Sequence, residues 1–306
     1  MMIIPKPLKP GDTIALIGVS GCIRSQDRNA EVEASAAKLT ALGFKVKVDP
    51  TCCSGYGYLS GTDAERAAAF NRAFADDSVD GVWCIRGGYG CIRLMDLIDW
   101  PMIARHPKAF IGYSDITTLH SALHQRCGLC TFHGPMPKTD SFEEPSLSSL
   151  MHAIQGQPDK ALVNPDGTRL KTLVGGVAEG ELVGGNLTLV TASVGTPFDL
   201  DVTGKLLFLE DVGEHTYSLD RYFQQLYLAG KLTKCAGVIL GGFTDCEIEY
   251  PEYGLTLEQV LQDVFSKVHV PVVAGLQAGH LKHKLTLPLG RRYRLDADKG
   301  AITLVE

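Results

Sequence analysis

Ser114 is the residue whose type and surroundings best suit covalent chemistry. It follows an apolar run that ends in Gly112-Tyr113, and residues 116–128 repeat apolar positions at helical spacing. This pattern predicts a tight strand-to-helix turn, with the Ser114 hydroxyl and the backbone amide of Asp115 on its open side. A nucleophilic serine needs such a turn, because the helix N-terminus and nearby amides favour developing negative charge. The competing interpretation is an ordinary helix cap, since Ser and Asp are favoured there.

A glycine-rich loop precedes this turn in the sequence. Residues 86–90 read Arg-Gly-Gly-Tyr-Gly and directly follow the apolar strand pattern of residues 81–85. Their spacing matches neither a Walker A sequence nor G-x-G-x-x-G, so they do not predict a nucleotide site. Adjacent glycines let a backbone N–H approach a reacting carbonyl closely, as an oxyanion hole requires. Beside Ser114, the loop favours the oxyanion role over phosphate binding.

A serine nucleophile also needs a base, and the base needs an acid that orients it. Among the nine histidines, His280 lies past a predicted strand end in a loop bounded by glycines. Glu210 directly follows the predicted strand at residues 205–209. The order serine, acid, histidine is that of hydrolases with a Ser–acid–His triad. Many sequences contain this order, and Ile116 departs from the G-x-S-x-G nucleophile elbow.

Two other groups of residues suggest metal or redox chemistry. His120 and His124 have zinc-ligand spacing on a helix, but no Glu at the metalloprotease position and no third ligand lie near them. Cys127 and Cys130 have redox spacing, yet they end the predicted helix instead of beginning it, where a thiol pKa would be lowered. We therefore expect neither a metal nor another cofactor.

The overall composition excludes several classes of protein. The chain has 306 residues, more than one hydrophobic core usually spans, so two domains are expected. A net charge of −6 disfavours nucleic-acid binding, and no apolar run approaches the roughly 20 residues of a membrane span. The first residues lack the apolar core of a signal peptide, and nine scattered cysteines suit reduced thiols, so a cytoplasmic location is predicted.

Strand and helix patterns alternate through the first half of the chain. The predicted strands are residues 13–18, 44–48, 81–85 and 109–113. The predicted helices are residues 29–42, 62–75 and 91–98, followed by the helix after Ser114. This alternation predicts a parallel sheet with right-handed crossovers, in which functional loops gather at the carboxyl ends of the strands. Gly88 and Ser114 both lie at such ends, on strands that we expect to be neighbours.

The second half of the chain is richer in short strands. Strand patterns occupy residues 205–209, 236–240, 270–273, 284–289, 292–296 and 301–305. The predicted helices are residues 187–194, 217–230 and 255–267. We place a polar linker at residues 137–172. The expected architecture is an α/β domain of the flavodoxin or Rossmann type at residues 1–165 and a β-rich domain at residues 166–306.

Five short blocks of sequence occur together in this chain. They are Arg-Gly-Gly-Tyr-Gly at 86–90, Gly-Tyr-Ser-Asp at 112–115, Gly-Gly-Asn-Leu at 184–187, Leu-Glu-Asp-Val at 209–212 and Ala-Gly-His at 278–280. In this order and at this spacing, the chain resembles the LD-carboxypeptidase family of serine peptidases, the muramoyltetrapeptide carboxypeptidases. The resemblance covers nearly the whole length, and it implies an α/β N-terminal domain followed by a β-rich C-terminal domain.

The resemblance also implies a role for each residue of the site. It gives Ser114 as nucleophile, Glu210 as orienting acid and His280 as base. The amides of Gly88 and Asp115 would form the oxyanion hole. The implied reaction hydrolyses the amide between an L-configured centre and a C-terminal D-amino acid, and so releases D-Ala from murein tetrapeptides during peptidoglycan recycling in the cytoplasm. Family members are commonly homodimers, so a homodimer is implied as well.

Two other functions stay open from the sequence. A related branch of the family cleaves microcin-type peptidyl-nucleotides, and a two-lobed small-molecule binding protein with an inactive triad would keep the same pattern. The predicted substrate contacts are Arg86, Tyr89 and Asn186. Arg221 is a second candidate for the substrate carboxylate, with a surface ion pair as its alternative role. The sequence does not distinguish meso-diaminopimelate from Lys at the third peptide position.

Overall fold

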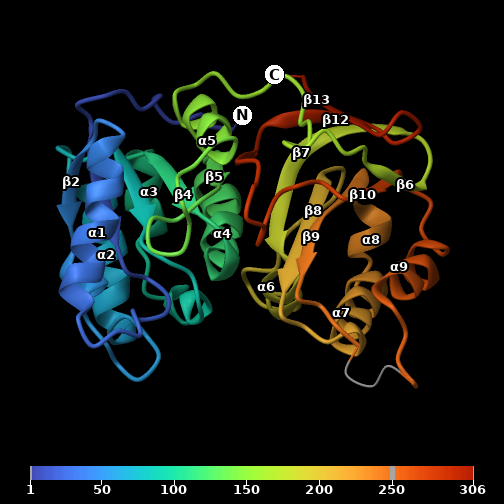
Figure 1. The fold of residues 1–306 in the computed structure, drawn as a ribbon, viewed down its shortest axis with the longest axis horizontal. Coiled ribbons are helices and arrows are strands. Elements are labelled where there is room, and N and C mark those ends of the chain that lie inside the picture. The colour runs from blue at the N-terminus through green and yellow to red at the C-terminus, as the bar shows by residue number, and fades with distance from the viewer. Residues whose placement is uncertain (1, 249–251, 306) are drawn as a thin grey trace. The chain divides into compact units, whose positions relative to one another are not determined.

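The structure, a computed structural model, describes residues 2–248 and 252–305. These residues form a mixed α/β fold with one six-stranded and one seven-stranded sheet (Figure 1). The predicted fold class is thereby confirmed. No helix within the described ranges is long and apolar enough to cross a membrane.

The chain divides into two compact units. Unit 1 runs to Pro158 and also takes in Thr286–Pro288 from late in the sequence. Unit 2 comprises Asp159–Leu285 and the described chain from Leu289 onward. The chain therefore leaves unit 1, builds most of unit 2, and returns once to unit 1 before it completes unit 2.

The sheet of unit 1 has the strand order β11-β5-β4-β3-β1-β2. Its strands are β1 (Thr13–Ile17), β2 (Lys45–Val48), β3 (Gly81–Cys84), β4 (Ala109–Gly112), β5 (Thr131–His133) and β11 (Leu287–Leu289). The strands from β2 to β5 pair in parallel, as predicted, and β2 is an edge strand. The chain leaves β1 and β3 in opposite directions along the sheet. Such a reversal is the switch point at which open α/β sheets bind ligands.

Helices cover both faces of this sheet. They are α1 (Arg28–Ala41), α2 (Asp63–Ala75), α3 (Trp100–Arg105), α4 (Thr117–Cys127) and α5 (Ser146–Ile154), with short 3₁₀ helices η1 (Pro50–Cys52), η2 (Cys91–Leu94) and η3 (Ser114–Ile116). Leu39 of α1 and Leu150 of α5 belong to the core cluster that contains Ile111 of β4. The ring of Phe70 from α2 packs edge-on against Phe110, the residue before Ile111, which faces the opposite side of the strand.

Two sequence predictions for unit 1 were wrong in detail. Residues 91–98 are not one helix, because only η2 forms there. A new helix, α3, begins after Asp99, whose side chain accepts from the Met102 amide, with Pro101 in the first turn. The predicted linker at 137–172 contains α5, whose apolar face is buried in the core of unit 1.

The sheet of unit 2 has the strand order β13-β12-β7-β8-β9-β10-β6. Its strands are β6 (Lys171–Val174), β7 (Val177–Asn186), β8 (Leu206–Val212), β9 (Gly237–Thr244), β10 (Val272–Ala274), β12 (Arg292–Asp296) and β13 (Ala301–Leu304). The strands from β7 to β10 are parallel, and β6, β12 and β13 join antiparallel at the two sides. The parallel centre explains why β8 and β9 are buried apolar runs without alternation.

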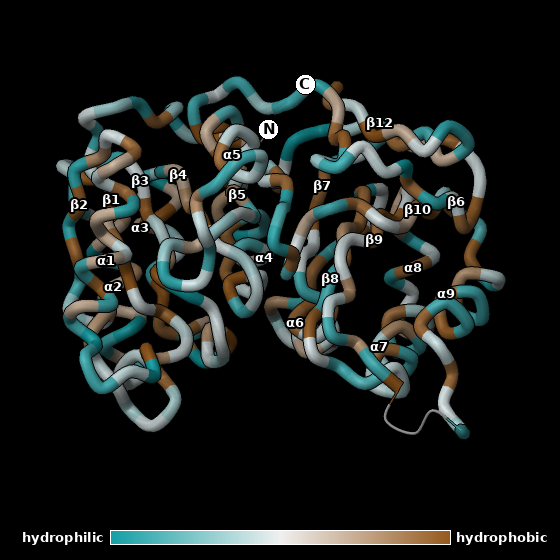
Figure 2. The backbone as a smooth tube through the Cα atoms, viewed as in Figure 1, coloured by the Kyte–Doolittle hydropathy of each residue, from teal (hydrophilic) through white to brown (hydrophobic). Residues whose placement is uncertain are grey.

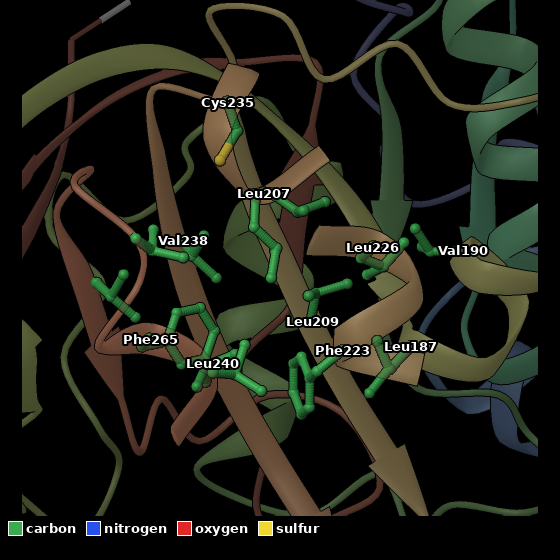
Figure 3. Packing of buried hydrophobic residues seen from close by; sticks show 14 of the residues in the cluster. Leu187, Val190, Leu207, Leu209, Phe223, Leu226, Cys235, Val238, Leu240 and Phe265 are labelled. Atoms are coloured by element: carbon green, nitrogen blue, oxygen red, sulfur yellow. The ribbon is translucent and has the colours of Figure 1, made fainter. Parts of the chain in front are cut away.

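Four helices of the described residues pack on this sheet. They are α6 (Leu187–Ala192), α7 (Thr216–Leu228), α8 (Lys231–Lys234) and α9 (Leu257–Phe265). Figure 3 shows Phe223 of α7 and Leu187 of α6 beside Leu209 of β8 and Leu240 of β9, all in one buried cluster. The chain of α9 alternates between brown and teal in Figure 2, as expected of a helix with one face in the core.

Candidate active site

Ser114 lies at the carboxyl end of β4, where η3 begins, as the sequence predicts. It is one of two non-glycine residues with positive φ in the described ranges, and its φ is 67°. A serine in this left-handed region costs conformational energy, and such strain is concentrated at functional turns. Ser114 is not a helix cap, because Tyr113 caps η3 and Ile116 caps α4, neither through a side-chain hydrogen bond. Ser114 itself is partly exposed.

The glycine-rich loop after β3 lies directly against this turn. A Cβ added to Gly87 would lie 2.9 Å from the Ser114 Cβ and 3.2 Å from its Oγ, so only glycine permits this approach. Gly88 has a φ of 132°, and its Cα region packs against the backbone of Gly21 in the loop after β1. The Gly21 amide donates to the Gly87 carbonyl over 3.3 Å. Backbone therefore packs on backbone around the serine.

The side chain of Asp115 ties three loops together. Its carboxylate is buried, and one oxygen accepts from the Ser20 hydroxyl over 2.6 Å and from the Cys91 amide over 2.9 Å. These partners lie after β1 and after β3, while Asp115 itself follows Ser114 after β4. One carboxylate thus fixes the positions of the loops that surround the nucleophile candidate. The sequence pointed to the Asp115 amide and gave no signal for its side chain.

Glu210 and His280 form a hydrogen-bonded pair within unit 2. The ring Nδ1 of His280 donates to Glu210 Oε2 over 2.7 Å, and the His280 amide donates to the same oxygen over 3.2 Å. The Glu210 side chain is fully buried, and that of His280 is 17% exposed. A carboxylate on Nδ1 fixes the tautomer, so the basic nitrogen of the neutral ring is Nε2. This is the arrangement required of a general base with an orienting acid.

Local irregularity in the sheet places Glu210. It lies within β8 and not after its end, contrary to the prediction. Leu209 pairs with Leu240, but Asp211 pairs with Phe243, so two glycines of β9 stand opposite Glu210 in a β-bulge. Bulges re-aim side chains next to functional sites.

Gly279 completes this setting. Its φ is 102°, and an added Cβ would lie 2.7 Å from both Cγ and Cδ of Glu210. Any side chain at 279 would therefore displace the carboxylate that holds His280. Glycine before His280 is therefore a steric requirement of this loop.

The predicted substrate residue Asn186 is buried and already engaged. Its Oδ1 accepts from the Leu189 amide and caps α6, and its Nδ2 donates to Asp211 Oδ1 over 2.8 Å. Asp211 also accepts from the Thr188 amide and hydroxyl. Asn186 therefore connects the end of β7 to β8, the strand that carries Glu210. The role of Asp211 was missed in the sequence, where only its neighbour drew attention.

Arg86 and Tyr89 lie in unit 1, at the loop after β3. Arg86 is half-buried, and burial, followed by the positive charge of Arg24, lowers the pKa of its guanidinium. Tyr89 is 48% exposed and meets Tyr58 edge-on, with ring centroids 5.6 Å apart. Both therefore lie where a ligand could reach them. Arg221, by contrast, lies in unit 2 over the ring of Tyr217.

The histidine and cysteine pairs considered for metal or redox chemistry have structural surroundings. Both ring nitrogens of His120 lie 2.8 Å from oxygen partners, the Thr131 hydroxyl and the Gly112 carbonyl, and burial lowers its pKa to about 4. No group of three or more His, Cys, Asp and Glu within residues 2–248 and 252–305 could hold a metal ion. Cys127 and Cys130 are buried free thiols, and burial raises the pKa of Cys127 to about 11.

The structure thus brings the site residues together in two groups. Ser114, Asp115 and Gly88 are neighbours in unit 1, and Glu210 and His280 are neighbours in unit 2. Each group lies on loops or a bulge at strand ends of a largely parallel sheet.

Comparison with known proteins gives matches to both units. Residues 14–134 match the LD-carboxypeptidase N-terminal domain, and residues 179–295 match the LD-carboxypeptidase C-terminal domain. A probable murein peptide carboxypeptidase of Bacillus subtilis is 40% identical over 301 residues, which cover 97% of this chain and 93% of the relative.

Two further relatives represent different branches. The crystal structure of a muramoyltetrapeptide carboxypeptidase from Oxalobacter formigenes superposes with a TM-score of 0.80 at 30% identity, over 95% of this chain and 97% of the other. The microcin C7 self-immunity protein MccF of Escherichia coli is 28% identical over 99% of this chain and 96% of its own length. The similarity in sequence is therefore greater to the murein peptide branch.

Proposed function

We propose that this chain, which belongs to the LD-carboxypeptidase family, is a serine carboxypeptidase that releases the C-terminal D-alanine of murein tetrapeptides. The observation that carries this proposal is the strained turn of Ser114 against Gly87, which presents a hydroxyl beside two loops of close-packed backbone. Such a strained turn is expected where a serine acts as a nucleophile, and Ser114 caps neither of the two helices beside it.

In this proposal the two predicted domains divide the chemistry. Residues 1–165 supply the nucleophile and the oxyanion donors, and residues 166–306 supply the acid and the base. Ser114 Oγ attacks the carbonyl carbon of the scissile amide while His280 Nε2 takes its proton. The amides of Gly88 and Asp115 donate to the developing oxyanion. Buried Glu210 stabilises the imidazolium that forms.

Collapse of the tetrahedral intermediate completes the first half of the reaction. The C–N bond breaks, and the imidazolium gives its proton to the nitrogen of the leaving D-alanine. The peptide remains as an ester on Ser114. A water molecule then attacks this ester, His280 accepts the proton of the water, and the second collapse returns the proton to Ser114 Oγ. No metal or organic cofactor takes part in these reaction steps.

The experiment compares two tetrapeptides that differ only at the last residue. We expect release of D-Ala from L-Ala-γ-D-Glu-meso-diaminopimelate-D-Ala, and little release of L-Ala from the L-terminal analogue, because a carbonyl misplaced by about 1 Å can react about 10²-fold more slowly. Ser114→Ala should lower turnover by roughly 10³-fold or more, with the fold intact. Ser148→Ala, an exposed serine of α5, is the matched control.

Three outcomes would contradict the proposal. Turnover by Ser114→Ala within about tenfold of wild type would reject the nucleophile. Equal release from both tetrapeptides would reject LD specificity. Cleavage of neither would favour the microcin-type branch or a binding protein.

We further propose that the enzyme acts in the cytoplasm as a homodimer. Fractionation of cells and light scattering of the purified protein measure these two properties directly. An extracellular enzyme or a monomer at working concentration would reject the respective statement.

A further inference from the structure

A hollow opens at the switch point of the unit 1 sheet. It is lined by the loop after β1, with Gly21, Cys22 and Arg24, by the loop after β3, with Arg86, Gly88 and Tyr89, and by Tyr58. Its volume is about 420 Å³. In sheets of this order, ligands bind in the crevice between these two loops.

The hollow carries positive charge that no acidic side chain of its described lining balances. Among the described residues that line it, the two charged ones are both arginines and none is acidic. Within the described part of the chain, neither Arg24 nor Arg86 has a carboxylate partner. Two guanidinium groups in one concavity repel each other unless an anion lies between or beside them. An anion is therefore the ligand that this arrangement favours.

Arg86 is held in place for such a ligand. Its Nε donates to the Gly87 carbonyl over 3.1 Å, and its Nη1 donates to the Cys22 carbonyl over 2.9 Å. These bonds fix the plane of the guanidinium and use only part of its donor set. A planar fork fixed in advance suits a carboxylate, which accepts two parallel hydrogen bonds. Arg24 is exposed and can approach the same anion from the other loop.

The position of the hollow indicates which carboxylate of the substrate would bind there. Gly88 borders it, and the Gly88 amide is one of the oxyanion donors of the proposed function. In a peptide, only the amide nitrogen and one Cα separate the scissile carbonyl from the carboxylate of the last residue. An anion in this hollow is therefore adjacent to a carbonyl that points at the Gly88 amide.

We propose that Arg24 and Arg86 together bind the terminal carboxylate of the leaving D-residue, and that this contact restricts cleavage to the last residue of the peptide. The inference rests on the proposed function. Tyr58 and Tyr89 line the same hollow, and their rings meet edge-on.

The test compares the tetrapeptide acid with the same peptide as its C-terminal amide. Loss of one charge-assisted contact should lower kcat/KM for the acid roughly 10- to 100-fold in Arg24→Ala, and hardly change it for the amide. The preference for acid over amide should fall by the same factor. Arg86→Lys keeps a charge but loses the fork, so it should lower the preference as well. Arg105→Ala, an exposed arginine of α3 outside the hollow, is the control.

A binding measurement separates this inference from the proposed function. Calorimetric titration of Ser114→Ala with acid and amide reads the preference without turnover. If the wild type cleaves no tetrapeptide but binds the acid through Arg24, the proposed function fails and the carboxylate site stands. If the preference for the acid is unchanged in both Arg24→Ala and Arg86→Lys, the site is wrong, whatever the turnover.

Discussion

Replacing Gly279 by alanine should separate folding from catalysis at the Glu210–His280 pair. The change adds one carbon, and that carbon would lie 2.7 Å from Cγ and from Cδ of Glu210. Ordinary contacts of this kind begin at 3.4 Å. The Glu210 side chain is fully buried, so it has no open space into which to withdraw.

The size of the effect follows from the displacement. Restoring ordinary contacts moves Cγ and Cδ by roughly 0.7 Å, and Oε2, the oxygen that binds His280, lies closer to the added carbon and must move further; a misplacement near 1 Å can cost about 10²-fold in rate. Complete loss of the orienting acid can cost about 10⁴-fold. We therefore expect kcat of Gly279→Ala to fall by roughly 10²- to 10⁴-fold. The left-handed backbone at 279 adds a destabilisation of about 1–3 kcal/mol.

The assay needs a control that has the backbone strain without the steric overlap. Gly275 precedes the same loop, its φ is 91°, and nothing lies within 4 Å of an added Cβ. Gly275→Ala should lower the free energy of unfolding by a similar amount and leave kcat within about threefold of wild type. Both variants are measured by D-Ala release and by urea unfolding. If Gly279→Ala keeps kcat within that margin, the reasoning about the Glu210–His280 pair is refuted.

Three other predictions concern unit 1 and the absence of a metal. Ser20→Ala removes one donor to buried Asp115, so urea unfolding should show a loss of about 1–3 kcal/mol, and an unchanged free energy would contradict the three-loop contact. Burial lowers the pKa of His120 to about 4, so the ring stays neutral in the folded protein down to that pH. In the unfolded chain the same ring takes up a proton below its ordinary pKa of about 6.5. The free energy of unfolding should therefore fall by about 3 kcal/mol as the pH falls from about 6.5 to about 4. His120→Gln should flatten that pH dependence, and equal slopes would reject the assignment. Dialysis against EDTA should leave full activity, and a loss that zinc restores would revive a metallohydrolase mechanism.

The features that could be predicted from the sequence are governed by neighbouring residues. The turn at Ser114 follows from an apolar strand, a Gly-Tyr pair and a helical repeat that lie side by side. Thr62 with Glu65 forms the capping box that begins α2, and Gly128 ends α4 in the left-handed conformation. Each of these signals is complete within a few residues, so no tertiary information was needed.

The features that could not be predicted depend on distant parts of the chain. Glu210 was expected beyond its strand, because a bulge formed by glycines of β9 leaves no mark on β8 itself. Helix α5 was taken for a linker, because its polar surroundings concealed a face that packs against strands far away in sequence. Arg24 drew no attention, since only the fold places it beside Arg86 at the ends of β1 and β3.

Strand β11 has a consequence for how the protein is made in the cell. The sheet that carries Ser114 is complete only when Leu287–Leu289 joins the edge of β5. On the ribosome, the N-terminal part therefore emerges with an open sheet edge, which stays unpaired until nearly all of the second unit has been translated. A fragment that stops at Pro158 would keep this open edge and should associate or require chaperones. Leu287–Leu289 is the last strand of this sheet to be translated and follows both Glu210 and His280 in the sequence, so the sheet that carries Ser114 closes only after these two residues have been synthesised.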